Sequence, residues 1–146
     1  MAKPIPEGYH SVQPYLYLKN ASDAIAFYAK AFGATERMRM PDNNGRIMHA
    51  EISLGDSCIM MADENEAIGA YSPQHYGGAP MSLMIYVEDC DVIYQRAMAA
   101  GATSLREPAD QFYGDRTAGV ADPFGFHWYI GTHIKDVSME EMQQHM

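Results

Sequence analysis

A chain of 146 residues with 47% apolar and 20% charged residues has the size and composition of one globular domain, not of a disordered or fibrous protein. Ten basic against nineteen acidic residues give a formal net charge of −9, without the basic stripes that nucleic-acid binding requires. No apolar run approaches the length of about 18 residues that a membrane span needs. We therefore expect neither nucleic acid nor a membrane as a partner.

The N-terminal sequence and the cysteine content predict a cytoplasmic protein. Residues 1–6 (MAKPIP) contain no apolar core of the kind found in secretory signals. Cys58 and Cys90 are too few for a framework of disulfide bonds. We interpret the acidity as a solubility feature, with a preference for cationic ligands as the alternative.

The first predicted element is a strand. Residues 11–18 alternate between two sets of side chains, which is the period of two that a strand shows. Gln13, Tyr15 and Tyr17 then share one face of this strand, and the leucines share the other.

A helix and three more strands follow in the first half. Apolar residues recur at helical spacing over residues 22–32, with Ser22 as the expected cap and Gly33 as the left-handed stop. The three strands are expected at residues 34–40, 47–54 and 57–62.

The middle of the chain is predicted to be a surface connection. Residues 63–80 contain three acidic residues, three glycines and two prolines. Such a composition favours irregular structure, and the segment is long enough to cover the mouth of a cleft.

The second half is predicted to repeat the order of the first. A helix begins at Asp89 or Asp91 and runs to Ala100, where Gly101 ends it. Residues 122–125 (DPFG) have the composition of a tight turn. The strands are expected at residues 82–87, 103–106, 116–121 and 126–131.

The two halves are related by sequence as well as by order. At an offset of 68, seven of the thirteen residues at 23–35 are identical to their counterparts at 91–103. A repeat of this length is one supersecondary unit used twice, and each copy needs the other to cover its apolar face. We expect a single domain over residues 1–146 that is built from repeats at 9–62 and 81–131.

This arrangement resembles the vicinal oxygen chelate superfamily, which contains glyoxalases, bleomycin resistance proteins, fosfomycin-modifying enzymes and extradiol dioxygenases. Residues 23–28 (DAIAFY), followed by Phe32 and Gly33, are similar to the first helix of that family. Residues 122–125 are similar to its closing turn. The resemblance implies an α+β fold, in which two tandem βαβββ units form a cup-shaped mixed sheet, the glyoxalase/bleomycin resistance fold.

Other segments resemble the PhnB-like branch of the superfamily. They are residues 47–51 (IMHAE) and residues 113–128, which begin with YGDR and end at Trp128. The resemblance also implies a homodimer, because the cups of this family often form between two chains.

The metal site of the family does not transfer to this chain. The resemblance places its four ligand positions on Gln13, Met60, Ser82 and Tyr129. A catalytic Zn²⁺, Fe²⁺ or Mn²⁺ needs about three donors that are imidazoles or anions, and these four side chains supply neither. We therefore expect no metal and no other cofactor at these positions.

His49 and Glu51 form the one pair that suggests chemistry. The two side chains share a strand face at a spacing of roughly 6–7 Å, which is too long for a direct hydrogen bond. A glutamate in an apolar cup has a raised pKa and can act as a base. In the alternative interpretation, Glu51 lies near an open rim and His49 bonds to a tyrosine. A displaced metal site that uses His49 and His127 is a further alternative.

The sequence therefore predicts a metal-free protein that binds a small organic molecule in the cup between the repeats. One alternative is a lyase, isomerase or dioxygenase-like enzyme with Glu51 as base or with a non-standard metal set. The other is a resistance protein that sequesters a drug. The residues expected to bind the ligand are Gln13, Tyr15, His49, Met60, Ser82, His127 and Tyr129.

Overall fold

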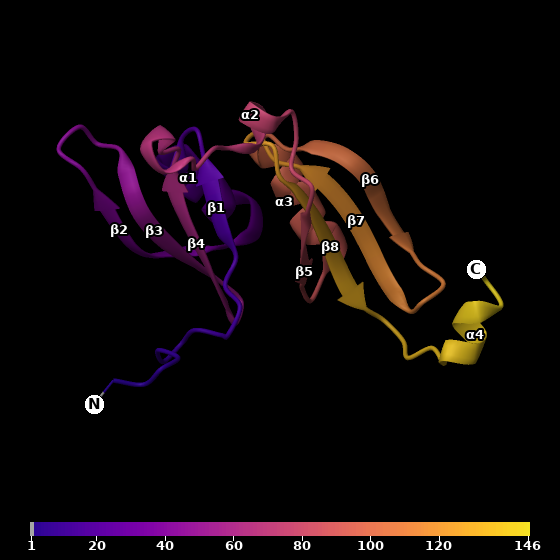
Figure 1. The fold of residues 1–146 in the computed structure, drawn as a ribbon. Coiled ribbons are helices and arrows are strands. Elements are labelled where there is room, and N and C mark those ends of the chain that lie inside the picture. Colours follow the sequence, from indigo (N-terminus) through magenta and orange to yellow (C-terminus); the bar gives the residue numbers. More distant parts are fainter. Residues whose placement is uncertain (1) are drawn as a thin grey trace. The chain divides into compact units, whose positions relative to one another are not determined.

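The computed structural model describes residues 2–146, which divide into two compact units, Met1–Gly78 and Ala79–Met146. Each unit contains one helix of at least eleven residues and one four-stranded sheet (Figure 1). No helix in the described residues is both long enough and apolar enough to cross a membrane. The elements in chain order are β1 (Tyr15–Leu18), α1 (Ala21–Phe32), β2 (Thr35–Pro41), β3 (Ile47–Leu54), β4 (Ser57–Asp63), η1 (Glu66–Ile68), α2 (Pro73–Tyr76), β5 (Ser82–Tyr86), α3 (Cys90–Ala100), β6 (Thr103–Asp110), β7 (Asp115–Ala121), β8 (His127–His133) and α4 (Met139–Gln143).

The sheet of the first unit has the strand order β1-β4-β3-β2. Strand β1 runs parallel to β4, and the other two pairs are antiparallel. Leu16, Met61 and Ala50 stand opposite one another on β1, β4 and β3, and all three are buried. This face packs on α1, whose Tyr28 is fully buried, and the contact between them is the core of the unit.

The second unit repeats this topology with the order β5-β8-β7-β6. Trp128 and Ile130 on β8 stand opposite Val120 and Ala118 on β7, and all four side chains are buried. Helix α3 packs on these strands. The predicted α+β fold of two tandem βαβββ units is thus confirmed, with one mixed sheet in each unit.

Helix α1 begins earlier than expected, whereas α3 begins after one of its two expected caps. Asn20, not Ser22, caps α1: its side-chain oxygen accepts a hydrogen bond from the Asp23 backbone N–H at 3.0 Å. Ser22 instead accepts a hydrogen bond from Arg39. Asp89 caps α3, so the first of the two proposed residues is the cap. The cap residue must keep an extended backbone, which Ser22 cannot do inside the first helical turn.

Strand β1 begins at Tyr15 and is shorter than predicted. Gln13 donates a side-chain hydrogen bond to the Cys58 carbonyl at 2.8 Å, and Pro14 has no N–H to offer a neighbouring strand. At the other end of the chain, β6 continues to Asp110 although it contains Pro108. This strand lies at the edge of its sheet and is irregular after Ser104, so a proline is tolerated there.

The predicted surface connection contains two short helices, η1 and α2. Asn65 caps η1, and its backbone pairs with Ala70 in an isolated bridge. Glu64 accepts hydrogen bonds from both the backbone and the hydroxyl of Ser72. These local bonds fix a segment whose composition predicted only irregular structure.

Asp122 holds the turn between β7 and β8. It is 6% exposed, and its Oδ1 accepts hydrogen bonds from the backbone N–H groups of Phe124 and Phe126. Its Oδ2 accepts one from the indole N–H of Trp128 at 2.8 Å, and that side chain is fully buried. The turn is therefore anchored to the core of the second unit by one carboxylate.

The substitution Asp122→Ala is expected to destabilise the protein by about 3 kcal/mol, because it leaves buried N–H groups without an acceptor. Urea unfolding followed by tryptophan fluorescence measures the difference, since Trp128 is the only tryptophan. The control is Asp89→Ala, which removes an exposed helix cap and is expected to cost about 1 kcal/mol. Equal losses in the two variants would contradict the anchoring role of Asp122.

Candidate functional site

The face of the first sheet opposite α1 carries the predicted chemical residues. Strand pairing places Tyr15, Met60, Glu51 and Met38 in one row across β1, β4, β3 and β2. Alternate residues of these strands pack on α1, so this row points to the other face. Tyr15 and Met38 are exposed at 38% and 36%, whereas Glu51 is only 4% exposed.

His49 and Glu51 are in direct contact, so the expectation of a gap of 6–7 Å is wrong. The Nε2 atom of His49 lies 2.8 Å from Oε2 of Glu51. Side chains two residues apart on one strand face can lean toward each other, and the spacing of the backbone does not report this. The hydroxyl of Tyr9, from the segment before β1, donates to the other Glu51 oxygen at 2.5 Å.

Tyr15 joins the contact between Tyr9, Glu51 and His49 on the exposed side of the sheet. The Tyr15 hydroxyl lies 2.8 Å from Nδ1 of His49. The alternative interpretation has two parts, and the first, that His49 bonds to a tyrosine, is correct. Its other half is wrong, because Glu51 is buried and does not lie at an open rim.

The pKa of Glu51 is lowered, and the expectation of a raised pKa is wrong. Burial raises the pKa, but the hydrogen bonds from Tyr9 and His49 and the charges of His49 and Arg37 outweigh it. Arg37 lies with its guanidinium carbon 4.8 Å from the centre of the Tyr9 ring. Glu51 is thus an ionised carboxylate with both oxygens hydrogen-bonded, which leaves it poorly placed to take a proton from a ligand.

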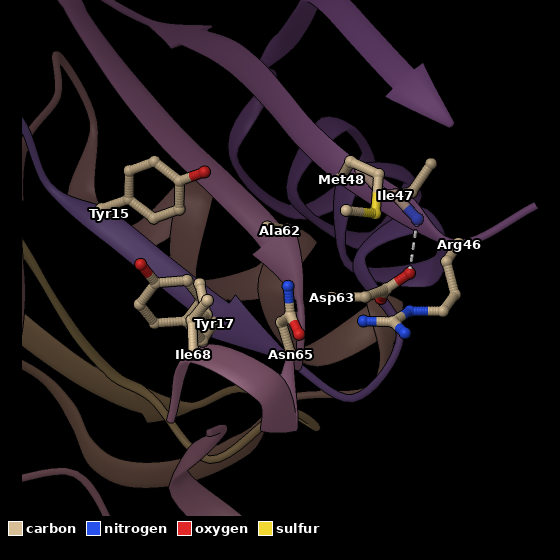
Figure 2. A pocket seen from close by; sticks show the side chains of 9 residues that line it. All are labelled: Tyr15, Tyr17, Arg46, Ile47, Met48, Ala62, Asp63, Asn65 and Ile68. Carbon is tan, nitrogen blue, oxygen red and sulfur yellow. Dashed lines mark hydrogen bonds between the residues drawn. The ribbon is translucent and has the colours of Figure 1, made fainter. Parts of the chain in front are cut away.

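A pocket lies beside Tyr15 on the same unit (Figure 2). The cavity itself has a volume of about 60 Å³, and the empty space reaches about 300 Å³ when the open solvent at its mouth is included. Tyr15 and Tyr17 form one wall, with ring centres 5.1 Å apart and planes inclined by 36°. Figure 2 shows Met48, Ile47 and Arg46 on the opposite side. The complete lining is Tyr15, Tyr17, Arg46, Ile47, Met48, Ala62, Asp63, Asn65 and Ile68.

The polar groups of the pocket differ in how many of their hydrogen-bonding positions are already occupied. Both oxygens of Asp63 accept backbone hydrogen bonds, from Ala21 at the start of α1 and from Ile47 on β3 (Figure 2 shows the second). Arg46 donates one N–H to the Glu64 carbonyl. The remaining guanidinium donors of Arg46 have no hydrogen bond among the described residues, so this group is available to a ligand.

The residues predicted to bind a ligand are distributed over both units. Gln13, Tyr15, His49 and Met60 belong to the first unit. Gln13 uses both ends of its amide, since its oxygen also accepts the backbone N–H of His10 at 2.6 Å. Of these four residues, only Tyr15 lines the pocket.

Ser82, His127 and Tyr129 belong to the second unit, on the face opposite α3. Ser82 stands opposite His127 on the paired strands β5 and β8. The Tyr129 ring lies across Gly119, where an added Cβ would come within 2.8 Å of it. The Arg106 guanidinium carbon lies 5.7 Å from the centre of this ring. These residues stay a prediction for ligand binding.

The second unit also contains a cluster that sequence patterns did not predict. Asp115 is 5% exposed and accepts hydrogen bonds from the Tyr86 hydroxyl and from Nδ1 of His133, each at 2.7 Å. Nε2 of His133 lies 2.7 Å from Asp136. Asp115 does not pair with its neighbour Arg116 on β7, because adjacent strand residues point to opposite faces.

Arg116 bonds instead to two other carboxylates. Its guanidinium contacts Asp91 at the start of α3 at 2.7 Å and Asp110 on β6 at 3.0 Å. It thus joins the helix of the second unit to the edge of its sheet.

The side chains at the family's metal positions do not fit a divalent transition metal. Gln13, Met60, Ser82 and Tyr129 offer an amide, a thioether and two hydroxyls, and the Gln13 amide is already bonded at both ends. A metal on His49 would have to displace Tyr15 or Glu51 from one of its ring nitrogens. Residues 2–146 contain no group of three His, Cys, Asp or Glu side chains arranged to hold a metal ion.

Several residues of this site have no recognisable signal in the sequence. Tyr9 precedes the first strand, and Arg46 follows a turn, where charged residues are common. Asn65 and Ile68 lie in the connection that was expected to cover a cleft mouth, and that expectation is the one signal that pointed to them. The period of two in the sequence correctly predicts that Tyr17 shares a strand face with Tyr15.

Comparisons with known proteins agree with this fold. The family model described as the Glyoxalase/Bleomycin resistance protein/Dioxygenase superfamily matches residues 9–130. The uncharacterized protein Mb0911c of Mycobacterium bovis is 39% identical over 139 residues, which cover 93% of this chain and 91% of that protein.

Solved structures are similar to the chain at lower identity. TioX from Micromonospora sp. ML1 superimposes with a TM-score of 0.66 at 23% identity, over 85% of this chain and 100% of that one. The PhnB protein from Bacillus cereus does so with a TM-score of 0.64 at 18% identity, over 84% of this chain and 99% of that one. At such identities the likeness shows the fold alone.

His133 gives a pH dependence that can be measured. Its hydrogen bonds to Asp136 and Asp115 raise its pKa above the ordinary value of about 6.5. The stability that it contributes is therefore fully present below pH 6.5 and is lost as the pH rises through the raised value. We expect the difference in urea midpoint between the wild type and His133→Gln to be largest near pH 6 and to shrink toward pH 9.

The control for this measurement is His145→Gln, which changes an exposed histidine near the end of the chain. It should leave the pH profile of the wild type unchanged. A difference between the wild type and His133→Gln that stays constant from pH 6 to pH 9 would show that the ion pairs of His133 contribute nothing.

Proposed function

Since the chain belongs to the Glyoxalase/Bleomycin resistance protein/Dioxygenase superfamily, we propose that it binds a small organic molecule in the pocket beside Tyr15 and Tyr17, without a divalent metal. Within the superfamily we assign it to the PhnB-like branch. The likeness to the Bacillus cereus PhnB protein supports this branch, although TioX superimposes equally well.

The observation that carries the proposal is the pair of tyrosine rings that forms one pocket wall. Two rings inclined by 36° present a broad apolar surface, and Met48, Ile47 and Ile68 add aliphatic surface around it. Ligand sites in proteins are typically apolar hollows with a few polar groups that orient the ligand. A flat aromatic ligand gains both burial and stacking from such a wall.

The polar side of the pocket supports a ligand with an anionic or strongly accepting group. Arg46 has guanidinium donors left over, whereas the carboxylate of Asp63 is occupied by two backbone N–H groups. The pocket therefore offers free guanidinium donors, while the Asp63 carboxylate keeps its negative charge but has both oxygens engaged by backbone N–H groups. The free donors of Arg46 favour an accepting or anionic group on the ligand over the cationic drug that the overall acidity suggested.

We propose binding without a metal because of the side chains at the four positions that the family uses for its metal. The four positions that the family uses for its metal carry no imidazole and no carboxylate in this chain. Ligand binding in the proposed pocket therefore does not require a metal ion.

The probe for this pocket is 1-naphthoate, which combines a flat aromatic body with a carboxylate. We expect Tyr17→Ala to weaken its binding about tenfold, which corresponds to the loss of one aromatic contact of about 1.4 kcal/mol. Naphthoate fluorescence measures the affinity. The control Tyr76→Ala removes an exposed tyrosine outside the pocket and should not change it.

Two further arms of the experiment test the rest of the proposal. Dialysis against EDTA should leave the affinity unchanged if no metal takes part. 1-Naphthylmethylammonium, a cation of similar shape, should bind more weakly than 1-naphthoate. Tighter binding of the cation would favour a drug-sequestering protein, and no binding of either probe would remove the proposed function.

We also propose that the protein forms a homodimer. The sheet face opposite the helix exposes large apolar side chains in each unit, such as Met40 on β2 and Met84 on β5. Exposed apolar surface of this kind typically marks an interface.

Sedimentation equilibrium at about 50 µM is expected to give twice the mass of one chain, since typical dimer interfaces bind well below that concentration. Met84→Glu places a charge on this face and should shift the distribution toward the monomer. The control is Met139→Glu on the exposed terminal helix α4, which should not. A monomer in the wild type would contradict the dimer.

A further inference from the structure

Four side chains of the first unit form a continuous line of hydrogen bonds from the core to the pocket. The Tyr9 hydroxyl bonds to Glu51 at 2.5 Å, Glu51 to His49 at 2.8 Å, and His49 to the Tyr15 hydroxyl at 2.8 Å. Glu51 lies buried within this line. Tyr15, at its end, lines the pocket (Figure 2). We call Glu51, His49 and Tyr15 the relay.

The direction of these hydrogen bonds depends on whether His49 is neutral or protonated. An ionised carboxylate only accepts hydrogen bonds, so Nε2 of His49 carries the hydrogen that is donated to Glu51. In the neutral imidazole Nδ1 is then an acceptor, and it receives the hydrogen of the Tyr15 hydroxyl. In this neutral form the Tyr15 oxygen faces its surroundings with lone pairs and accepts hydrogen bonds.

A proton added to His49 reverses the polarity of Tyr15. Both ring nitrogens of an imidazolium donate, so Nδ1 would donate to the Tyr15 oxygen and free the Tyr15 hydrogen for another acceptor. The imidazolium would lie against the Glu51 carboxylate, whose negative charge offsets the new positive one. Glu51 is held in place by Tyr9 and by the weak donor Cys58, and Arg37 lies on the side of Tyr9.

We propose that the relay receives the proton of an acidic hydroxyl group, phenolic or enolic, on the ligand, so that the pocket binds this ligand as its anion. In this step the ligand O–H bond breaks and its electron pair stays on the ligand oxygen. The proton forms a new O–H bond at Tyr15, while the former Tyr15 proton forms an N–H bond at Nδ1 of His49. The products are a ligand oxyanion and an imidazolium paired with Glu51.

This inference rests on the proposed function and narrows it to one ligand class. An aromatic phenol satisfies both requirements of the site, because its ring matches the Tyr15 and Tyr17 wall and its hydroxyl meets a polarised tyrosine. As in a catalytic triad, a carboxylate (Glu51) orients a histidine (His49), and the histidine polarises a hydroxyl (Tyr15). Tyr15 is the residue in contact with the ligand, and Glu51 is a positioning residue.

The test uses 4-nitrophenol, whose anion is coloured. We expect binding to raise its ionisation constant about tenfold, as one neighbouring opposite charge typically does, and absorbance of the anion measures this. Nitrogen-15 NMR of His49 should show the neutral form with hydrogen on Nε2 in the free protein. The same signal should change to the doubly protonated form when 4-nitrophenol binds.

Variants separate proton transfer from binding. Tyr15→Phe keeps the ring and removes the hydroxyl, so it should abolish both changes; its affinity for 1-naphthoate is measured in parallel, so that a loss of binding is told apart from a loss of proton transfer. Glu51→Gln should shift the His49 tautomer in the free protein and reduce the change in ionisation. The control Tyr76→Phe removes a hydroxyl outside the pocket and should behave as the wild type.

Three results would overturn the inference, and they can be told apart. If 4-nitrophenol displaces 1-naphthoate but its ionisation and the His49 signal stay unchanged, the relay does not accept a proton. If 4-nitrophenol fails to displace bound 1-naphthoate, the ligand class is wrong. If 1-naphthoate itself does not bind, the proposed function fails, and the relay fails with it.

Discussion

One constraint governs both halves of this protein: a four-stranded sheet has two faces, and the single long helix of each unit can cover only one of them. Helix α1 covers one face of the first sheet and α3 one face of the second. The side chains on the covered faces are apolar and buried, as Met61 and Trp128 illustrate. The other face is then free to carry tyrosines, methionines and polar groups, so everything proposed about function concerns that face.

Buried carboxylates are the second organising feature. Glu51, Asp115 and Asp122 are each at most 6% exposed, and each accepts at least two hydrogen bonds from neighbouring strands or turns. Burial alone disfavours the charge, but these donors lower the pKa of Glu51 and of Asp115. The carboxylates therefore act as fixed acceptors that hold histidines, tyrosines and the tryptophan in place.

The fold was predictable from the sequence because its signals are local and repeated. The period of two in β1, the helical spacing in α1 and the glycine stops at Gly33 and Gly101 each depend on near neighbours. The contact between His49 and Glu51 was not predictable, since it depends on how two side chains lean and on Tyr9, which lies 42 positions from Glu51. The pocket escaped prediction for the same reason: Ile68 and Arg46 meet Tyr17 only after folding.

Ile68 contributes to the pocket wall but not to the hydrophobic core. Ile68 lies on η1, is 70% exposed, and belongs to an element without buried residues. Tyr15 and Tyr17 belong to a strand that is locked between β4 and the start of α1 by Asp63. Substitutions at Ile68 can therefore reshape this side of the pocket at little cost to folding, so under the proposed function the connecting segment can tune the choice of ligand while the tyrosine wall stays fixed.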